Sequence, residues 1–249
     1  MDECVKSVYD VFENCSPAEY VAAIVMEPLQ GEGGFIPAPI EFVKAVRKIC
    51  DENGILLIAD EVQSGFGRTG KLFASEYWKE NGCAPDIIAT AKSIAGGVPL
   101  SAVIASKEVM DAVPGGTIGG TYGGNALACA AGLEVLKLMD EGGLVKRSQE
   151  IGKKVMAAFN EMKEKYEVVG DVRGLGAMIG VEFVKDKKTK EPNPEFVGKF
   201  IQECAKNGLL VENAGIYGNV IRFLAPLVIT DAQLDAGLEI YENAIKACM

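Results

Sequence analysis

The chain has 249 residues, of which 49% are hydrophobic, enough apolar material for one large domain or for one and a half to two ordinary ones. Its 25 basic residues against 35 acidic ones, with no long basic run, argue against binding to nucleic acid. The chain contains no histidine, which excludes Ser-His-Asp and Cys-His nucleophile systems and the usual zinc sites with histidine ligands.

The first part of the chain alternates short β-rich runs with segments of helical periodicity, which predicts an α/β sheet. Strands are expected within residues 20–27, 55–59, 85–91 and 99–106. Helices are expected over residues 39–53 and 125–139. Apolar residues recur near helical spacing in the first of these helices, and Gly54 stands where a left-handed C-terminal cap is expected.

From about residue 144 the sequence changes to a long, charged, amphipathic helix that is expected to end near Tyr166. This change predicts a boundary between a domain of residues 1–143 and a smaller domain of residues 144–249. The smaller domain is expected to contain strands at 167–172, 178–184, 209–212 and 219–223, and helices at 194–206 and at the C-terminus. Thr230 and Gln233 have the spacing of a capping box at the start of that last helix.

Neither the N-terminus nor any internal apolar run indicates a membrane segment. The first 15 residues carry scattered acids, and the longest apolar runs are too short to span a bilayer.

The seven cysteines are an odd number without a C-x-x-C pair. This pattern favours reduced thiols in a cytoplasmic protein over disulfides or a zinc site.

Two charged residues follow apolar runs that are expected to be strands of one sheet. Asp60 and Glu61 come directly after residues 55–59, and Lys92 comes after residues 85–91 and before a pair of glycines. Ligands of open α/β sheets bind at the carboxyl ends of the strands, and a lysine amine can form an imine with a carbonyl group. Taken singly, Asp60 and Glu61 also fit acids that end a strand and turn into solvent, and Lys92 also fits an ordinary surface lysine.

A glycine-rich segment and an arginine in an apolar run also suggest binding sites. Residues 65–70 (GFGRTG) satisfy the dinucleotide-binding pattern G-x-G-x-x-G, but five residues separate them from the preceding strand, so we expect no such site. Arg222 lies inside the apolar run of residues 219–224. An arginine there needs an anion, which could be the carboxylate of a ligand or of a structural ion pair.

Several motifs occur in one order throughout the chain. They are residues 27–35 (EPLQGEGGF), 57–70 (LIADEVQSGFGRTG), 119–125 (GGTYGGN) and 171–176 (DVRGLG). Together they resemble the subgroup III aminotransferases of fold type I, which depend on pyridoxal phosphate. Within that family the chain most resembles the 4-aminobutyrate type, through residues 109–112 (VMDA) with 119–122 (GGTY) and through residues 219–227 (NVIRFLAPL). The resemblance implies an α/β fold with an incomplete large domain, built on a mixed and mostly parallel sheet, and a small C-terminal α+β domain.

The resemblance also implies roles for individual residues around pyridoxal 5'-phosphate. Lys92 would be the Schiff-base lysine, and Asp60 would keep the pyridine nitrogen protonated. Val62 would pack on the ring face, and Gln63 would reach the phenolic oxygen. Thr121 would contact the cofactor phosphate of the neighbouring subunit, which implies a homodimer with shared active sites.

The same resemblance assigns the substrate carboxylate to Arg222. Glu32 would pair with this arginine while an ω-amine is bound, and would move away when glutamate or 2-oxoglutarate must be held. Glu32 also fits a simple turn acid in a glycine-rich loop. We expect Arg173, in the VRGLG motif, to be structural.

The chain departs from the family in one respect. Family members carry an earlier segment with a turn that binds the cofactor phosphate and an aromatic residue that stacks on the ring, and neither has a counterpart here. We therefore expect transamination of 4-aminobutyrate, or a similar ω-amino acid, with 2-oxoglutarate, impaired if that segment is absent. The alternatives are an acetylornithine or ornithine aminotransferase, or a catalytically silent fragment that dimerises.

Overall fold

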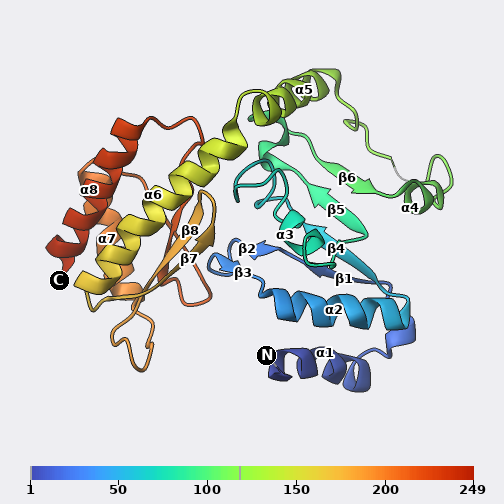
Figure 1. Cartoon of the computed structure of the whole chain (residues 1–249), viewed down its shortest axis with the longest axis horizontal. Coiled ribbons are helices and arrows are strands. Elements are labelled where there is room, and N and C mark those ends of the chain that lie inside the picture. The colour runs from blue at the N-terminus through green and yellow to red at the C-terminus, as the bar shows by residue number, and fades with distance from the viewer. Residues whose placement is uncertain (1, 118) are drawn as a thin grey trace. The chain divides into compact units, whose positions relative to one another are not determined.

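A computed structural model describes residues 2–117 and 119–249 of the chain. These residues form two compact units (Figure 1). The first unit contains residues 1–28, 38–66 and 71–142. The second unit contains residues 29–37, 67–70 and 143–249, so it takes two short segments from the earlier half of the chain.

The first unit is built on a four-stranded sheet with the order β1-β4-β5-β6. Its strands are β1 (Ala23–Met26), β4 (Leu56–Asp60), β5 (Ile87–Thr90) and β6 (Ala102–Ala105). β1, β4 and β5 run parallel, and β6 runs antiparallel to β5. The sheet is therefore mixed and mostly parallel, as predicted. Its helices are α1 (Asp2–Asn14), α2 (Ile40–Asn53), α3 (Glu76–Lys79), α4 (Lys107–Asp111) and α5 (Ala126–Asp140), with 3-10 helices at Ala18–Tyr20 and Lys92–Ala95.

The core of the first unit lies between α2 and the sheet. Val43, Val46 and Cys50 of α2 cluster with Leu57 and Ala59 of β4, and all five are almost fully buried. α2 ends where the sequence predicted, because Gly54 adopts a left-handed φ of 67° and donates its N–H to the carbonyl oxygen of Cys50. The helix α1 was not predicted from the sequence, and it buries none of its residues.

The second unit is built on an antiparallel sheet with the order β7-β8-β10-β9 and a two-stranded ladder of β2 and β3. Its strands are β2 (Leu29–Gln30), β3 (Ile36–Pro37), β7 (Val169–Leu175), β8 (Met178–Phe183), β9 (Glu212–Ala214) and β10 (Val220–Phe223). Its helices are α6 (Leu144–Lys165), α7 (Pro194–Lys206) and α8 (Asp231–Cys248). In Figure 1 these three helices lie together beside the sheet.

An aromatic cluster fills the core of the second unit. The rings of Phe159, Phe183, Phe196, Phe200 and Tyr241 contact one another with centroid separations of 4.6 to 6.2 Å. Such edge, tilted and stacked contacts add to the stability gained by apolar burial.

Two sequence predictions for the second unit have opposite outcomes. The capping box is confirmed, because the Thr230 hydroxyl accepts the N–H of Gln233 and the Gln233 side chain accepts the N–H of Thr230. The strand expected at residues 209–212 was wrong: β9 starts only at Glu212. Periodicity cannot locate such a short strand, because β9 is defined by its pairing with β10.

None of the described helices is both long and apolar enough to cross a membrane.

Candidate active site

Asp60 and Lys92 lie at the same edge of the first unit's sheet. Asp60 is the last residue of β4 and pairs in register with Ala89 of the parallel neighbour β5. Lys92 begins a 3-10 helix two residues beyond the end of β5. Because parallel strands place their carboxyl ends together, the sheet brings both residues to the edge where ligands of α/β proteins bind.

The backbone of Lys92 is unusual for a lysine. Its φ is 50°, in the left-handed region that non-glycine residues seldom adopt. Such strain is found disproportionately at active sites and ligand clamps. The side chain is exposed and forms no ion pair with any other residue that the structure describes, which leaves the amine accessible for chemistry.

The carboxylate of Asp60 is half-buried and accepts one hydrogen bond from a described residue. One oxygen accepts the backbone N–H of Val62 at 3.0 Å, and within the described part of the chain the carboxylate makes no ion pair. Val62 and Gln63 lie half-buried in the turn that follows β4. Asp60 can therefore accept a further hydrogen bond from a protonated group.

Glu61 behaves differently from its neighbour Asp60. It is fully buried and accepts the hydroxyl of Ser64 at 2.6 Å and the backbone N–H groups of Ala74 and Ser75 at 3.1 and 2.5 Å. The sequence suggested a pair of acids at a strand end, but Glu61 instead fixes the loop that follows β4. The serine three residues later was the only local signal of this role.

The dinucleotide pattern forms no nucleotide-binding turn. No helix begins within the described residues 65–75, and the next one, α3, has only four residues. Thr121 lies exposed in the turn that precedes α5. Within the part of the chain that the structure describes, it is not hydrogen-bonded to Asp60 or Lys92.

Arg222 is the centre of a charged cluster in the second unit. Its Nη1 lies 2.5 Å from Oε1 of Glu32, and its Nη2 lies 2.9 Å from Oε2 of Glu212. The arginine side chain is only 15% exposed, whereas the two glutamate side chains are 72% and 76% exposed. The Nε of Arg222 is buried and bonds to no described residue. The structure thus brings Glu32 and Arg222 together, and it adds Glu212, which the sequence prediction had missed.

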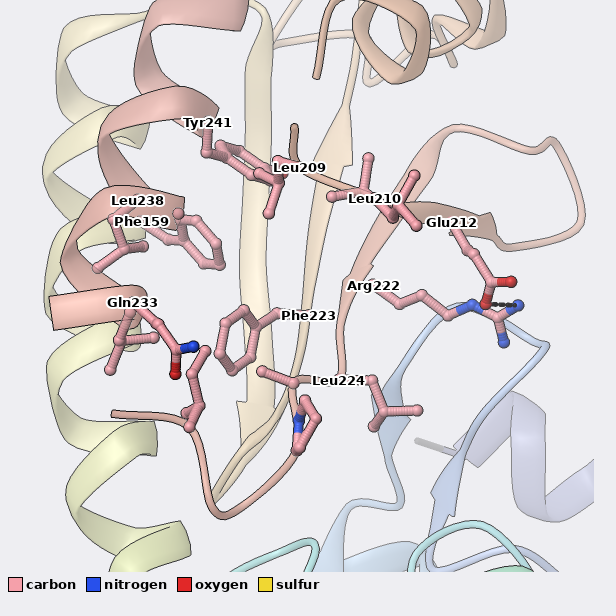
Figure 2. A pocket seen from close by; sticks show the side chains of 16 residues that line it. Phe159, Leu209, Leu210, Glu212, Arg222, Phe223, Leu224, Gln233, Leu238 and Tyr241 are labelled. Atoms are coloured by element: carbon pink, nitrogen blue, oxygen red, sulfur yellow. Dashed lines mark ion pairs between the residues drawn. The ribbon is translucent and has the colours of Figure 1, made fainter. Parts of the chain in front are cut away.

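A cavity of about 390 Å³ lies beside this cluster within the second unit (Figure 2). Its wall is mainly apolar, and Arg222 and Glu212 contribute to it. The remaining wall includes Leu209, Phe223, Gln233, Leu238 and Tyr241. In Figure 2 the Arg222 and Glu212 side chains extend to one side, away from the helix that carries Gln233 and Tyr241.

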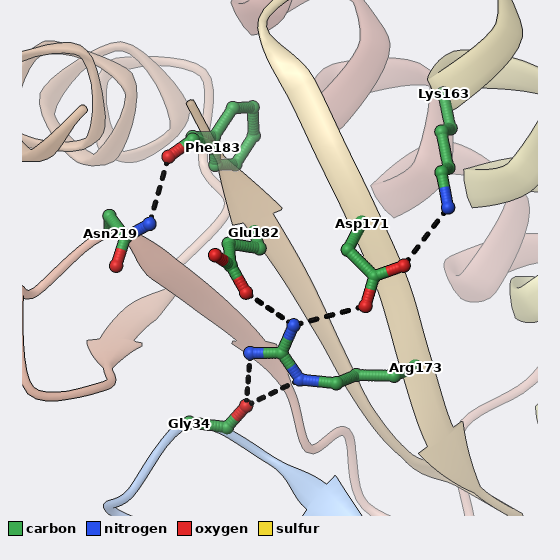
Figure 3. Close-up of polar contacts among 7 residues, drawn as sticks. All are labelled: Gly34, Lys163, Asp171, Arg173, Glu182, Phe183 and Asn219. Carbon is green, nitrogen blue, oxygen red and sulfur yellow. Dashed lines mark hydrogen bonds and ion pairs between the residues drawn. The ribbon is translucent and has the colours of Figure 1, made fainter. Parts of the chain in front are cut away.

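Arg173 has the structural role that the sequence suggested (Figure 3). Its Nε and Nη2 donate to the carbonyl oxygen of Gly34 at 3.1 and 2.8 Å, and its Nη1 contacts Asp171 at 3.1 Å and also Glu182. Burial alone would raise the pKa of Asp171, but hydrogen bonds from Lys163 and Arg173 outweigh it and leave that pKa below its ordinary value. The network ties the turn that carries Glu32 to β7.

Comparisons with known proteins agree with these features. The family model described as aminotransferase class-III matches residues 1–245. The chain is 49% identical over 243 residues to a 5-aminovalerate aminotransferase of Pseudomonas putida, a match that covers 98% of this chain and 56% of that protein. It is 47% identical over 239 residues to a 4-aminobutyrate aminotransferase of Escherichia coli, covering 96% of this chain and 55% of that one.

One solved structure with a similar fold is an amine transaminase from an uncultivated Pseudomonas species in its PLP-bound form. It superposes with a TM-score of 0.89 at 34% identity, and the match covers 100% of this chain and 57% of that one. The chain therefore spans about half the length of the curated relatives it matches.

Proposed function

The chain belongs to the class-III aminotransferase family, and we propose that it acts in the pyridoxal-phosphate-dependent transamination of an ω-amino acid with 2-oxoglutarate. The observation that carries this proposal is the position of Asp60 and Lys92 at the carboxyl ends of adjacent parallel strands. The names of two relatives, a 5-aminovalerate and a 4-aminobutyrate aminotransferase, favour donors with a terminal amine and a distal carboxylate.

The residues at the sheet edge fit pyridoxal phosphate. When bound, this cofactor supplies an electron sink for the carbanion that forms when the substrate carbon loses its proton. Asp60, with a carboxylate that accepts one backbone hydrogen bond, would hold the proton on the pyridine nitrogen. Lys92, with an exposed amine, would bind the aldehyde group and then carry the proton to and from the substrate carbon.

Other residues would complete the binding of the cofactor. Val62 would pack against the ring, and the Gln63 amide would reach the phenolic oxygen. Thr121 would contact the phosphate from a neighbouring subunit, which makes a homodimer with shared active sites part of the proposal. The odd number of cysteines without paired spacing favours the cytoplasm as the location.

Arg222 would hold the carboxylate of the substrate, because its planar guanidinium can bind a carboxylate bidentately. Its ion pair with Glu32 supports this role. Glu32 would neutralise the arginine while an ω-amino acid is bound, because the carbon that bears the reacting amine carries no carboxylate, and would move away when glutamate or 2-oxoglutarate must be held. The same arginine would thus serve both half-reactions.

The test is a half-reaction followed by visible absorption. The purified chain is mixed with pyridoxal phosphate, and 5-aminovalerate, 4-aminobutyrate, acetylornithine or ornithine is then added. We expect a band of bound cofactor that the first two amines convert to the pyridoxamine form faster than the last two. A preference for ornithine or its acetyl derivative would move the function to that class. No band at all would support the silent fragment instead.

A further inference from the structure

Arg222 has two acidic partners where the neutralisation of one cation needs only one. Glu32 contacts Nη1 and Glu212 contacts Nη2, and both glutamates belong to the second unit. One guanidinium between two carboxylates leaves the cluster with a net charge of −1. A site that must receive a ligand carboxylate is therefore electrostatically biased against it.

The two glutamates differ in how they are held. Glu212 lies on β9, where it is the antiparallel register partner of Arg222 on β10. Glu32 lies in the turn between β2 and β3. The ladder keeps Glu212 beside Arg222 even when Glu32 moves. A ligand carboxylate that replaces Glu32 at Nη1 then binds next to the negative charge of Glu212.

The nitrogen that Glu212 occupies matters as well. A carboxylate can form two hydrogen bonds with a guanidinium either through Nη1 and Nη2 or through Nη2 and Nε. Nη2 takes part in both arrangements. The Nε of Arg222 is buried and unbonded among the described residues, so the remaining donor is not available to solvent. Any bidentate ligand must therefore share Nη2 with Glu212.

We propose that Glu212 is a specificity-determining residue that lowers the affinity of Arg222 for the carboxylate of a dicarboxylate. This inference rests on the proposed function, because it deepens the role of Arg222 in that site. Glu212 would selectively weaken the binding of the 2-oxo dicarboxylate or of glutamate, the ligands for which Glu32 must leave. Donors that bind while Glu32 still pairs with Arg222 would be affected less.

The test measures the binding of glutarate to the purified chain by isothermal titration calorimetry. Glutarate has two carboxylates but no amine or 2-oxo group, so it cannot react with Lys92 or the cofactor and reports on carboxylate binding alone. Removing a unit charge about 4 Å from the bound carboxylate should tighten binding about threefold to tenfold in the Glu212→Gln variant at low salt. The gain should shrink as ionic strength rises, because Glu212 is 76% exposed and its charge is screened.

Glu191→Gln is the matched control. Glu191 is an exposed acid of the second unit that pairs with Lys185, and its removal changes the net charge by the same amount. Its glutarate affinity should equal that of the unmodified chain. The Nε–Hε resonance of Arg222 should shift on addition of glutarate, which locates the binding.

The proposal is overturned if Glu212→Gln binds glutarate no more tightly than the unmodified chain, or if Glu191→Gln gives the same gain. It is also overturned if no variant binds glutarate or if the Arg222 resonance does not move. Loss of the visible cofactor band, in contrast, would count against the proposed function alone, because the glutarate titration does not involve the cofactor.

Discussion

The carboxylate of Glu61 accepts the backbone N–H of Ser75, fourteen residues further along the chain, at an N···O distance of 2.5 Å. The same carboxylate binds the N–H of Ala74 and the hydroxyl of Ser64. This buried side chain therefore fixes both ends of the segment that follows β4, and that segment carries Val62 and Gln63. The proposed cofactor site depends on a residue that would not touch the cofactor.

Glu61→Ala should destabilise the chain strongly. The substitution leaves two buried N–H groups without acceptors, and we expect the free energy of unfolding to fall by roughly 2 to 4 kcal/mol. Urea denaturation measures the change. The control is Glu52→Ala. Glu52 is exposed near the end of α2, where it forms a surface ion pair in which Oε1 lies 3.7 Å from Nζ of Lys48. Equal stability of the two variants would show that the Glu61 contacts contribute little.

A pair of glycine substitutions in the second unit should act in opposite directions. Gly176 has a φ of 52°, and a Cβ there would lie 2.3 Å from the carbonyl carbon of Thr69. Gly176→Ala should therefore cost about 3 kcal/mol or more in the free energy of unfolding. Gly198 lies on α7 with nothing within 4 Å of an added Cβ, so Gly198→Ala should stabilise the chain by about 0.5 to 1 kcal/mol. Thermal denaturation distinguishes them, and a tolerated Gly176→Ala would contradict the tight approach of residues 69 and 176.

The Asp171 network predicts a specific pH dependence of stability. The folded pKa of Asp171 lies below its ordinary value of 3.8. A carboxylate with a lowered folded pKa stabilises the fold above its unfolded pKa, and this stabilisation is lost as the pH falls through the folded pKa. Asp171→Asn should therefore lower stability at pH 7, and the difference from the unmodified chain should shrink below about pH 4. Urea titrations at several pH values test this, and a difference that stays constant down to pH 2 would exclude the mechanism.

Local chemistry made several features of the fold predictable. Gly54 could be placed as the end of α2 and Thr230 as the start of α8, because each cap satisfies backbone groups within a few residues. The parallel strands that end at Asp60 and near Lys92 followed from two apolar runs. The mixed sheet followed from the family resemblance, since its strand order depends on contacts that single segments do not determine.

Features set by long-range contacts could not be predicted. The second unit includes residues 67–70, and the N–H of Ala177 donates to the carbonyl oxygen of Arg68 at 3.0 Å. Glu212 was missed for a similar reason, because only the pairing of β9 with β10 brings it to Arg222. Ser64 was the single local signal that Glu61 turns to the core, because its other two partners, the N–H groups of Ala74 and Ser75, lie 13 and 14 residues further along the chain.

The visible spectrum of the chain with pyridoxal phosphate, compared between the unmodified chain and Lys92→Ala, tests whether Lys92 binds the cofactor. The control is Lys107→Ala, because Lys107 is an exposed lysine of α4 that pairs with Asp111. We predict a visible band of bound cofactor that survives gel filtration in the unmodified chain and in Lys107→Ala, and that is absent in Lys92→Ala. A band that persists in Lys92→Ala, or no band in the unmodified chain, would show that Lys92 does not bind the cofactor in this chain.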